Sequence, residues 1–277
     1  MDLSIPLPEG LALRIADEAE GGDHYPTRRL QKGPLLVADG RLLAEEGVGF
    51  GVPILKRGIQ TIFPGGMSLA WRRRGRLWDV TATYDLCLVE RLARQGGSSF
   101  QPHPLYTAKD SLAALHRRSP RLRGLLTAAS STLRRAFGWV TTFEDAGFHA
   151  PIEVRCTVDG DSGRVDVSLT LTGLPDGVTE VVVMNEQGGR SFDIYVDSSG
   201  AALHGPEIGA WDDVPAARAA FVSTTAGAMF SLGQADGATL RRGRELIGGR
   251  LAWAGFGYSL PPTVTRFGYD VRIERTS

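Results

Sequence analysis

The sequence predicts an all-β protein, mainly an antiparallel β-sandwich or β-barrel of about a dozen strands, with one α-helical hairpin inserted. Short runs of alternating apolar and polar residues are separated by tight-turn signals, as expected for antiparallel strands. Strands and helices do not alternate in the regular way that a parallel sheet requires. We expect one β domain over residues 1–277, because sandwiches and barrels of this length are often single domains.

The first expected element is a meander of about five or six strands over residues 35–91. Asp-Gly between apolar runs is a strong hairpin signal, because a type I′ turn needs positive φ. The predicted turns are Asp39-Gly40, Arg57-Gly58, Pro64-Gly65-Gly66 and Arg74-Gly75. The longest expected strand, residues 76–90, closes the meander.

Helical composition over residues 106–137 predicts the helical hairpin, which opens its second helix at Pro120 and ends before Gly138. Strands return over residues 139–277. The expected runs are 152–158, 164–171, 178–184, 190–196, 219–224, 250–260 and 264–274. Residues 159–163 and the pair Gly188-Gly189 have the composition of hairpin turns between neighbouring runs.

Composition limits the classes of partner. Lys and Arg (31) balance Asp and Glu (31), so no overall field favours nucleic acid or an anionic membrane. The N-terminus lacks the features of a signal peptide, and no apolar run approaches the length of a spanning helix, which favours a cytoplasmic protein. We expect Cys87 and Cys156 to be buried free thiols, and we expect neither a metal site nor a cofactor. The oligomeric state stays open.

Residues 45–55, EEGVGFGVPIL, place three glycines on one face of a strand and leave that face nearly bare. Residues 252–261 repeat the Gly-Phe-Gly feature. Glycine inside a strand marks a bend, a close approach of another backbone, or a floor for a ligand. We favour close packing for Gly49 and a ligand floor for Gly257, which lies near the end of its strand.

Three side chains are candidates for acid–base catalysis. Glu46, or Glu45 if a bulge shifts the register, would place a carboxylate at the end of a core-facing row, where its pKa would rise. His149 follows two acidic residues in a turn region, and Glu186 lies at the expected end of a buried strand. The alternatives are a simple edge charge for the glutamate pair and polar hairpin tips for His149 and Glu186.

Further residues are candidates for binding a ligand. Trp211 lies beside carboxylates, an arrangement that suits a sugar because the ring stacks on C–H faces while acids bind hydroxyls. A helix cap explains the same acids equally well. The full set of predicted ligand-binding residues is Glu45, Phe50, Trp78, Tyr84, Asn185, Trp211, Trp253, Gly257 and Tyr258.

The leading functional hypothesis is a protein that binds a small molecule, namely a carbohydrate or another polyhydroxylated compound, with or without metal-independent acid–base catalysis. One alternative is a protein that binds or cyclises an apolar lipid, terpenoid or polyketide in an aromatic pocket. Another is a non-catalytic interaction module. The motifs of nucleotide binding, common serine hydrolases and zinc proteases are absent from the sequence.

Overall fold

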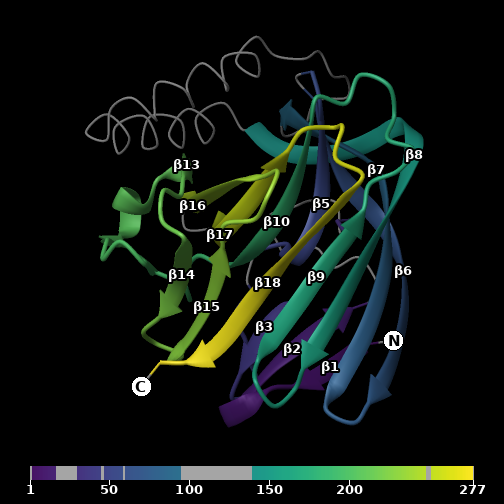
Figure 1. Ribbon diagram of the computed structural model, residues 1–277. Coiled ribbons are helices and arrows are strands. Elements are labelled where there is room, and N and C mark those ends of the chain that lie inside the picture. The colour runs from purple at the N-terminus through teal and green to yellow at the C-terminus, as the bar shows by residue number, and fades with distance from the viewer. Residues whose placement is uncertain are drawn as a thin grey trace.

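The computed structural model describes residues 2–16, 30–44, 47–58, 60–94, 139–247 and 251–276. Nearly all of this part of the chain forms antiparallel β-sheet, as the sequence predicts (Figure 1). The expected helical hairpin at 106–137 lies outside the described residues. The single domain over 1–277 includes that segment and therefore stays a prediction.

A small N-terminal sheet has four strands in sequential order. They are β1 (Asp2–Pro6), β2 (Leu11–Ala16), β3 (Leu35–Ala38) and β4 (Arg41–Leu42), and a 3-10 turn (Pro8–Gly10) joins the first two. Ile5, Leu13 and Ile15 alternate with exposed or half-buried residues and are almost fully buried. Sequence analysis missed β1 and β2, and it assigned β3 and β4 to the same meander as the strands that follow them.

The second sheet contains fourteen of the described strands, and its spatial order differs strongly from the chain order. From one edge to the other it comprises β12 (Ala202–His204), β11 (Ile194–Asp197), β14 (Arg218–Ser223), β15 (Ala228–Gly233), β18 (Arg266–Arg275), β9 (Arg164–Thr170), β8 (Trp139–Asp159), β7 (Leu77–Arg94), β6 (Gln60–Arg74), β5 (Gly49–Arg57), β10 (Glu180–Gly188), β17 (Leu251–Leu260), β16 (Thr239–Ile247) and β13 (Ala210–Asp213). The short 3-10 helix η2 (Gly205–Ile208) links β12 to β13.

Most of the predicted tight turns are confirmed. Asp39 and Gly40 both have positive φ, 50° and 77°, and they close the β3–β4 hairpin. The Arg57-Gly58 and Arg74-Gly75 turns close the β5–β6 and β6–β7 hairpins. Residues 159–163 join β8 to β9 as expected. These turns depend on local backbone conformation, which a short sequence can specify.

Two predicted hairpins are wrong. Strand β6 passes straight through Pro64-Gly65-Gly66, where its register with β7 shifts instead of reversing. Strand β10 continues to Gly188 and pairs with β5 and β17, whereas β11 pairs with β12 and β14. At the first place long-range pairing overrides the local turn propensity of glycine. At the second place the chain does turn at residues 189–191, directly after β10, but β10 and β11 are not neighbours in the sheet and form no hairpin.

The large sheet folds over on itself to form a sandwich. Strands β5 and β15 have five strands between them in the sheet, so a flat sheet would separate them by roughly 29 Å. The ring centroids of Phe50 on β5 and Phe230 on β15 are nevertheless 5.3 Å apart, and Phe221 and Phe256 make a similar contact at 4.9 Å. Among the described strands β12 and β13 are edges, so the barrel alternative is not supported: the sheet is open.

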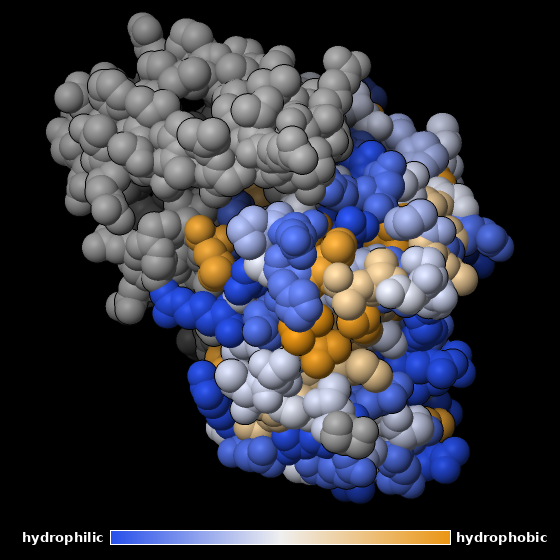
Figure 2. Space-filling view, turned by 90° about the vertical axis from the view of Figure 1, so that its left-hand side faces the viewer, coloured by the Kyte–Doolittle hydropathy of each residue, from blue (hydrophilic) through white to orange (hydrophobic). Residues whose placement is uncertain are grey.

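Side chains near the two ends of the chain connect the two sheets. Arg275 on β18 donates to the carbonyl oxygen of Glu9 and to the carboxylate of Asp39, both in the N-terminal sheet region. Apolar residues of both sheets belong to one continuous core. On the side of the molecule shown in Figure 2 the described surface is mainly hydrophilic, with hydrophobic residues in small groups. None of the helices in the described ranges has the length and apolar character of a membrane span.

The two Gly-Phe-Gly stretches lie on the strands that flank β10, so that Phe50 and Phe256 both pair with Asn185. At Gly49 the space for a Cβ atom is filled by the backbone of Gly33, whose carbonyl carbon and oxygen would lie 2.7 Å away. Gly49 also has φ of +93°. Its bare face therefore serves close backbone packing, as we expected.

We predict that Gly49→Val lowers the free energy of unfolding by about 3 kcal/mol or more, because overpacking and a strained φ act together. The matched control is Gly66→Val on β6, where nothing lies within 4 Å of an added Cβ atom and φ is not positive. Chemical denaturation of both variants measures the difference. Equal stability of the two variants would contradict the packing role of Gly49.

Candidate functional site

Strand β10 carries three consecutive buried polar residues, Asn185, Glu186 and Gln187. Buried polar groups are stable only when they are hydrogen-bonded. The Asn185 side-chain oxygen accepts from the Gly51 N–H at 3.1 Å and from the Tyr269 hydroxyl at 2.7 Å. Asn185 therefore connects three strands, β5, β10 and β18, rather than lying free to bind a ligand.

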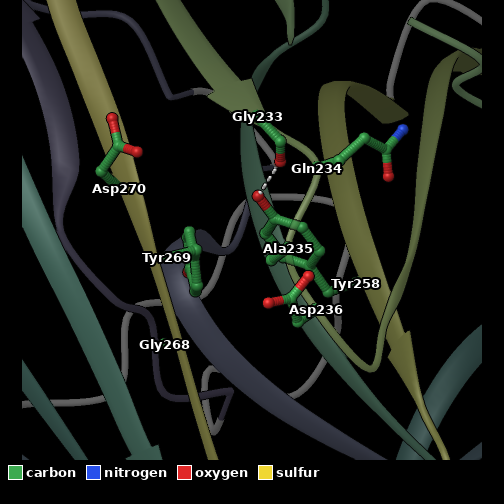
Figure 3. A pocket seen from close by; sticks show the side chains of 8 residues that line it. All are labelled: Gly233, Gln234, Ala235, Asp236, Tyr258, Gly268, Tyr269 and Asp270. Atoms are coloured by element: carbon green, nitrogen blue, oxygen red, sulfur yellow. Dashed lines mark hydrogen bonds between the residues drawn. The ribbon is translucent and has the colours of Figure 1, made fainter. Parts of the chain in front are cut away.

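A pocket of about 310 Å³ opens beside Tyr269 (Figure 3). Its residues come from the end of β15 and the loop that follows it, from β17 and from β18. They are Gly233, Gln234, Ala235, Asp236, Tyr258, Gly268, Tyr269 and Asp270. We call it the Tyr258–Tyr269 pocket, and its lining is mainly polar.

The two tyrosine rings give the pocket a rigid aromatic side. Their centroids are 4.6 Å apart, and the Tyr258 hydroxyl donates to the Gly233 carbonyl oxygen at 2.6 Å (Figure 3). Burial raises the pKa of both hydroxyls, so both tyrosines are neutral at physiological pH. Because each hydroxyl is already hydrogen-bonded within the protein, the rings are fixed in orientation. Tyr258 is fully buried and supports the half-buried Tyr269 ring, which is the one that can meet a ligand.

Asp270 supplies a fixed negative charge. Arg218 donates to its carboxylate at 2.9 Å and also donates to the side chain and carbonyl oxygen of Ser231. Partial burial by itself would raise the pKa of Asp270, but the hydrogen bond and charge of Arg218 hold it below its ordinary value. Asp236 and Gln234 lie in the exposed loop on the other side of the pocket.

Glu186 is placed differently from these carboxylates. Its side chain is 5 % exposed, and burial raises its pKa to about 8, although a hydrogen bond from the Val48 backbone and the charge of Lys32 act in the opposite direction. As neighbours in a strand, Glu186 and Asn185 point to opposite faces of the sheet. Glu186 is therefore a neutral carboxylic acid near pH 7, as expected of a general acid, but it does not line the Tyr258–Tyr269 pocket.

His149 pairs with an acid that sequence analysis did not assign to it. Its Nδ1 lies 2.7 Å from the carboxylate of Asp85 on β7, and both side chains are partly or largely exposed. The hydrogen bond and charge of Asp85 raise the pKa of His149. Strands β8 and β10 have three strands between them in the sheet order. His149 is hydrogen-bonded to Asp85, whereas Glu186 accepts from the Val48 backbone, so the two side chains have different partners. Glu45 and Glu46 lie outside the described residues.

The expected ligand floor at Gly257 is covered by the protein itself. The space for a Cβ atom at Gly257 lies 2.7 Å from the Trp211 ring, which stacks on Trp253 with centroids 5.1 Å apart. Gly243 on β16 receives the Trp253 ring in the same way. Gly257 is therefore not a bare floor for a ligand, because the Trp211 ring packs on it.

The remaining predicted ligand-binding residues divide between core and pocket. Phe50 and Tyr84 are buried in the core, and Trp78 packs against Trp71 and the guanidinium of Arg73. Only Tyr258 lines the pocket. Sequence analysis missed Gln234, Asp236, Tyr269 and Asp270. The first two lie in a polar turn (Gln-Ala-Asp-Gly) after β15, a strand that was itself missed. Tyr269 and Asp270 lie within the expected strand 264–274, where no local signal distinguishes them from other strand residues.

No protein-family model and no curated protein matches this chain. Solved structures do match this chain in fold. An α-N-acetylgalactosaminidase from Bifidobacterium bifidum, solved in complex with GalNAc, matches with a TM-score of 0.50 at 10% identity, covering all of this chain and 36% of the enzyme. This chain thus spans about a third of the enzyme's length. A protein from Escherichia coli K12 that is proposed to be an aldose 1-epimerase matches with a TM-score of 0.40 at 7% identity, covering 99% of both chains.

The raised pKa of Glu186 predicts how stability depends on pH. Between about pH 4.5, the ordinary value, and pH 8, the folded protein keeps a proton that the unfolded chain has lost. The contribution of neutral Glu186 is complete below this range and is lost as the pH rises through it, by at most about 1.4 kcal/mol per pH unit.

We therefore expect Glu186→Gln to remove part of the loss of stability between pH 5 and pH 8, as measured by urea denaturation at several pH values. The control is Glu274→Gln, which changes an exposed carboxylate on β18 in the same way. Curves for Glu186→Gln and wild type that run parallel over this range would show that Glu186 is ionised in the folded protein.

Proposed function

We propose that this protein binds a carbohydrate, or a closely related polyhydroxylated compound, in the Tyr258–Tyr269 pocket. The observation that carries the proposal is a fixed and partly exposed tyrosine ring, Tyr269, which packs on the buried Tyr258 and has carboxylate and amide groups around the same cavity. A sugar ring has apolar C–H faces that stack on aromatic rings and hydroxyls that donate to carboxylates.

The volume of the pocket supports a small ligand. At about 310 Å³ it is at the lower end of the range for ligand pockets. We therefore favour a monosaccharide, or the terminal residue of a longer glycan, over an extended oligosaccharide buried along its length.

The charges in the pocket support a neutral or hydroxyl-rich ligand rather than an anion. Asp270 remains ionised beside Arg218 and can accept hydrogen bonds from hydroxyl groups. Asp236, on the exposed loop, adds a second carboxylate. An apolar lipid or terpenoid has less support, because the aromatic residues expected to line its pocket, such as Phe50 and Phe256, pack against other rings of the core.

The fold adds a reason to choose a carbohydrate among hydroxyl-rich ligands. The α-N-acetylgalactosaminidase that shares this fold was solved with GalNAc, so N-acetylgalactosamine is a rational first ligand to test. Fold similarity by itself does not assign function, and the proposal therefore depends on the pocket.

Acid–base catalysis stays a second proposal, for Glu46, His149 and Glu186. It is favoured by the raised pKa of Glu186, because a general acid must hold its proton near neutral pH. Incubation of the protein with any sugar that binds, followed by NMR detection of hydrolysis or anomer exchange, tests this proposal. Loss of turnover in Glu186→Gln with binding retained would support it, and unchanged turnover would exclude Glu186.

For binding, we predict that saturation-transfer NMR against a panel of neutral monosaccharides, with GalNAc and galactose included, detects at least one ligand. Asp236→Ala should weaken its affinity about tenfold or more, because a hydrogen bond to a charged group contributes about 1.5 to 3 kcal/mol. Asp236 is exposed, so the variant should fold normally.

Asp176→Ala, which removes an exposed carboxylate from a loop that does not line the pocket, is the matched control and should bind as wild type does. Two results would overturn the proposal. One is the absence of binding across the panel, and the other is a bound sugar whose affinity is the same in Asp236→Ala and in Asp270→Asn.

A further inference from the structure

Asp85, Cys87 and His149 form a second group of chemically capable side chains, which lies away from the Tyr258–Tyr269 pocket. Each offers one carboxylate, thiol or imidazole atom, and these atoms all lie within 4.8 Å of one another. We call them the Asp–Cys–His cluster. Asp85 and Cys87 are two residues apart on β7 and therefore share one face of that strand. His149 comes from the neighbouring strand β8.

The backbone around Cys87 is irregular on both sides. Leu86 pairs with Ala150 but Leu88 pairs with Asp145, so residues 146–149 of β8 lie opposite Cys87 alone. On the other side β6 shifts register between Phe63 and Gly66. Bulges redirect side chains and are frequent beside functional sites. Here the bulge in β8 includes His149, and it places the imidazole against Asp85.

Gly65 allows the third strand to approach the thiol. A Cβ atom at this position would lie 2.7 Å from the Cys87 sulfur, so only glycine leaves room for it. The Gly65 backbone also donates a hydrogen bond to the thiol. The sulfur is therefore held beside the carboxylate and the imidazole, while His149 and Asp85 keep the cluster open to solvent, with exposed side-chain fractions of 68% and 39%.

Carboxylates surround the cluster, which favours a bound cation: Asp85 belongs to it, and the charge of Asp145 acts on both Cys87 and His149. Partial burial and the negative charges of Asp85 and Asp145 raise the pKa of Cys87. The same carboxylates also raise the pKa of His149. A divalent cation would be attracted by these carboxylates and would stabilise the Cys87 thiolate.

We propose that the Asp–Cys–His cluster is a zinc site, in which the Cys87 sulfur, one imidazole nitrogen of His149 and one carboxylate oxygen of Asp85 bind the ion. Ligand atoms around tetrahedral zinc lie roughly 3.3 to 3.8 Å apart, a spacing that small side-chain rotations reach from the observed separations. The thiolate and imidazole select zinc over magnesium and calcium, which prefer oxygen ligands. Water or Asp145 completes the coordination.

Binding of zinc would release the thiol proton of Cys87 to solvent, together with any proton that makes the His149 imidazole cationic. Thiolate and carboxylate then balance the charge of the ion. Sequence analysis expected no metal site, because it looked for closely spaced Cys and His motifs. These ligands are 62 residues apart along the chain (His149 − Cys87 = 62) and meet only through strand pairing.

The test uses the full chain, freed of metal by a chelator and titrated with zinc in a calorimeter and with cobalt in a spectrophotometer. We expect one ion per chain and a thiolate-to-cobalt charge-transfer band in the near ultraviolet. Cys87→Ser and His149→Gln should each weaken zinc binding at least about tenfold, and Cys87→Ser should also abolish the band. Both changes are nearly isosteric, and His149 is exposed, so folding should be unaffected.

His204→Gln, which changes an exposed histidine elsewhere, is the matched control and should bind zinc as wild type does. Thiol labelling gives a second measurement, because zinc should protect Cys87 from the reagent, while the buried Cys156 stays unlabelled with or without metal. Absence of stoichiometric binding, or binding that is unchanged in Cys87→Ser and His149→Gln, would overturn the proposal. Sugar binding in the other pocket is independent of either result.

Discussion

Three consecutive polar side chains on β10 are buried and must all be hydrogen-bonded, and the rest of the structure depends on this constraint. Asn185 binds the backbone of β5 and the hydroxyl of Tyr269, and Gln187 binds Leu36 and Pro34 next to β3. The Val48 backbone donates to Glu186 between them. Because an unpaired buried polar group is costly, these bonds fix which segments can approach the centre of the sheet. They join the N-terminal sheet, the central strands and β18 in one arrangement.

The glycines around β10 make those hydrogen bonds possible. Gly49 lets the backbone of residues 33–34 approach β5, and Gly255 leaves room for the backbone of β10 itself. Phe50 and Phe256, between the glycines, face the opposite half of the folded sheet and meet Phe230. In each Gly-Phe-Gly stretch one glycine, Gly49 or Gly255, thus lets another backbone approach, while the phenylalanine fills the core. The two stretches are alike because both flank the same strand.

Both proposed sites lie where the regular sheet is interrupted or ends. The Tyr258–Tyr269 pocket forms where β15 ends and a polar loop follows it, beside tyrosines that Asn185 and Gly233 hold in place. The Asp–Cys–His cluster forms where β6 and β8 both lose register with β7. A regular antiparallel sheet satisfies its own backbone groups and alternates its side chains, so it leaves little room for converging polar groups. Where the strand pairing is irregular, polar side chains from neighbouring strands can converge, and the packed core beneath them holds these side chains in place.

The sequence by itself determined the fold class, most hairpin turns of the described strands and the packing role of Gly49, because alternation, turn residues and glycine conformation act over a few neighbouring residues. It did not determine that β10 pairs with β5 and β17 instead of β11, that Trp211 covers Gly257, or that His149 meets Asp85 and Cys87. These depend on pairing between residues far apart in the chain. Only the tertiary structure decided them, because long-range strand order is set by how the whole core is filled and by which buried polar groups are satisfied.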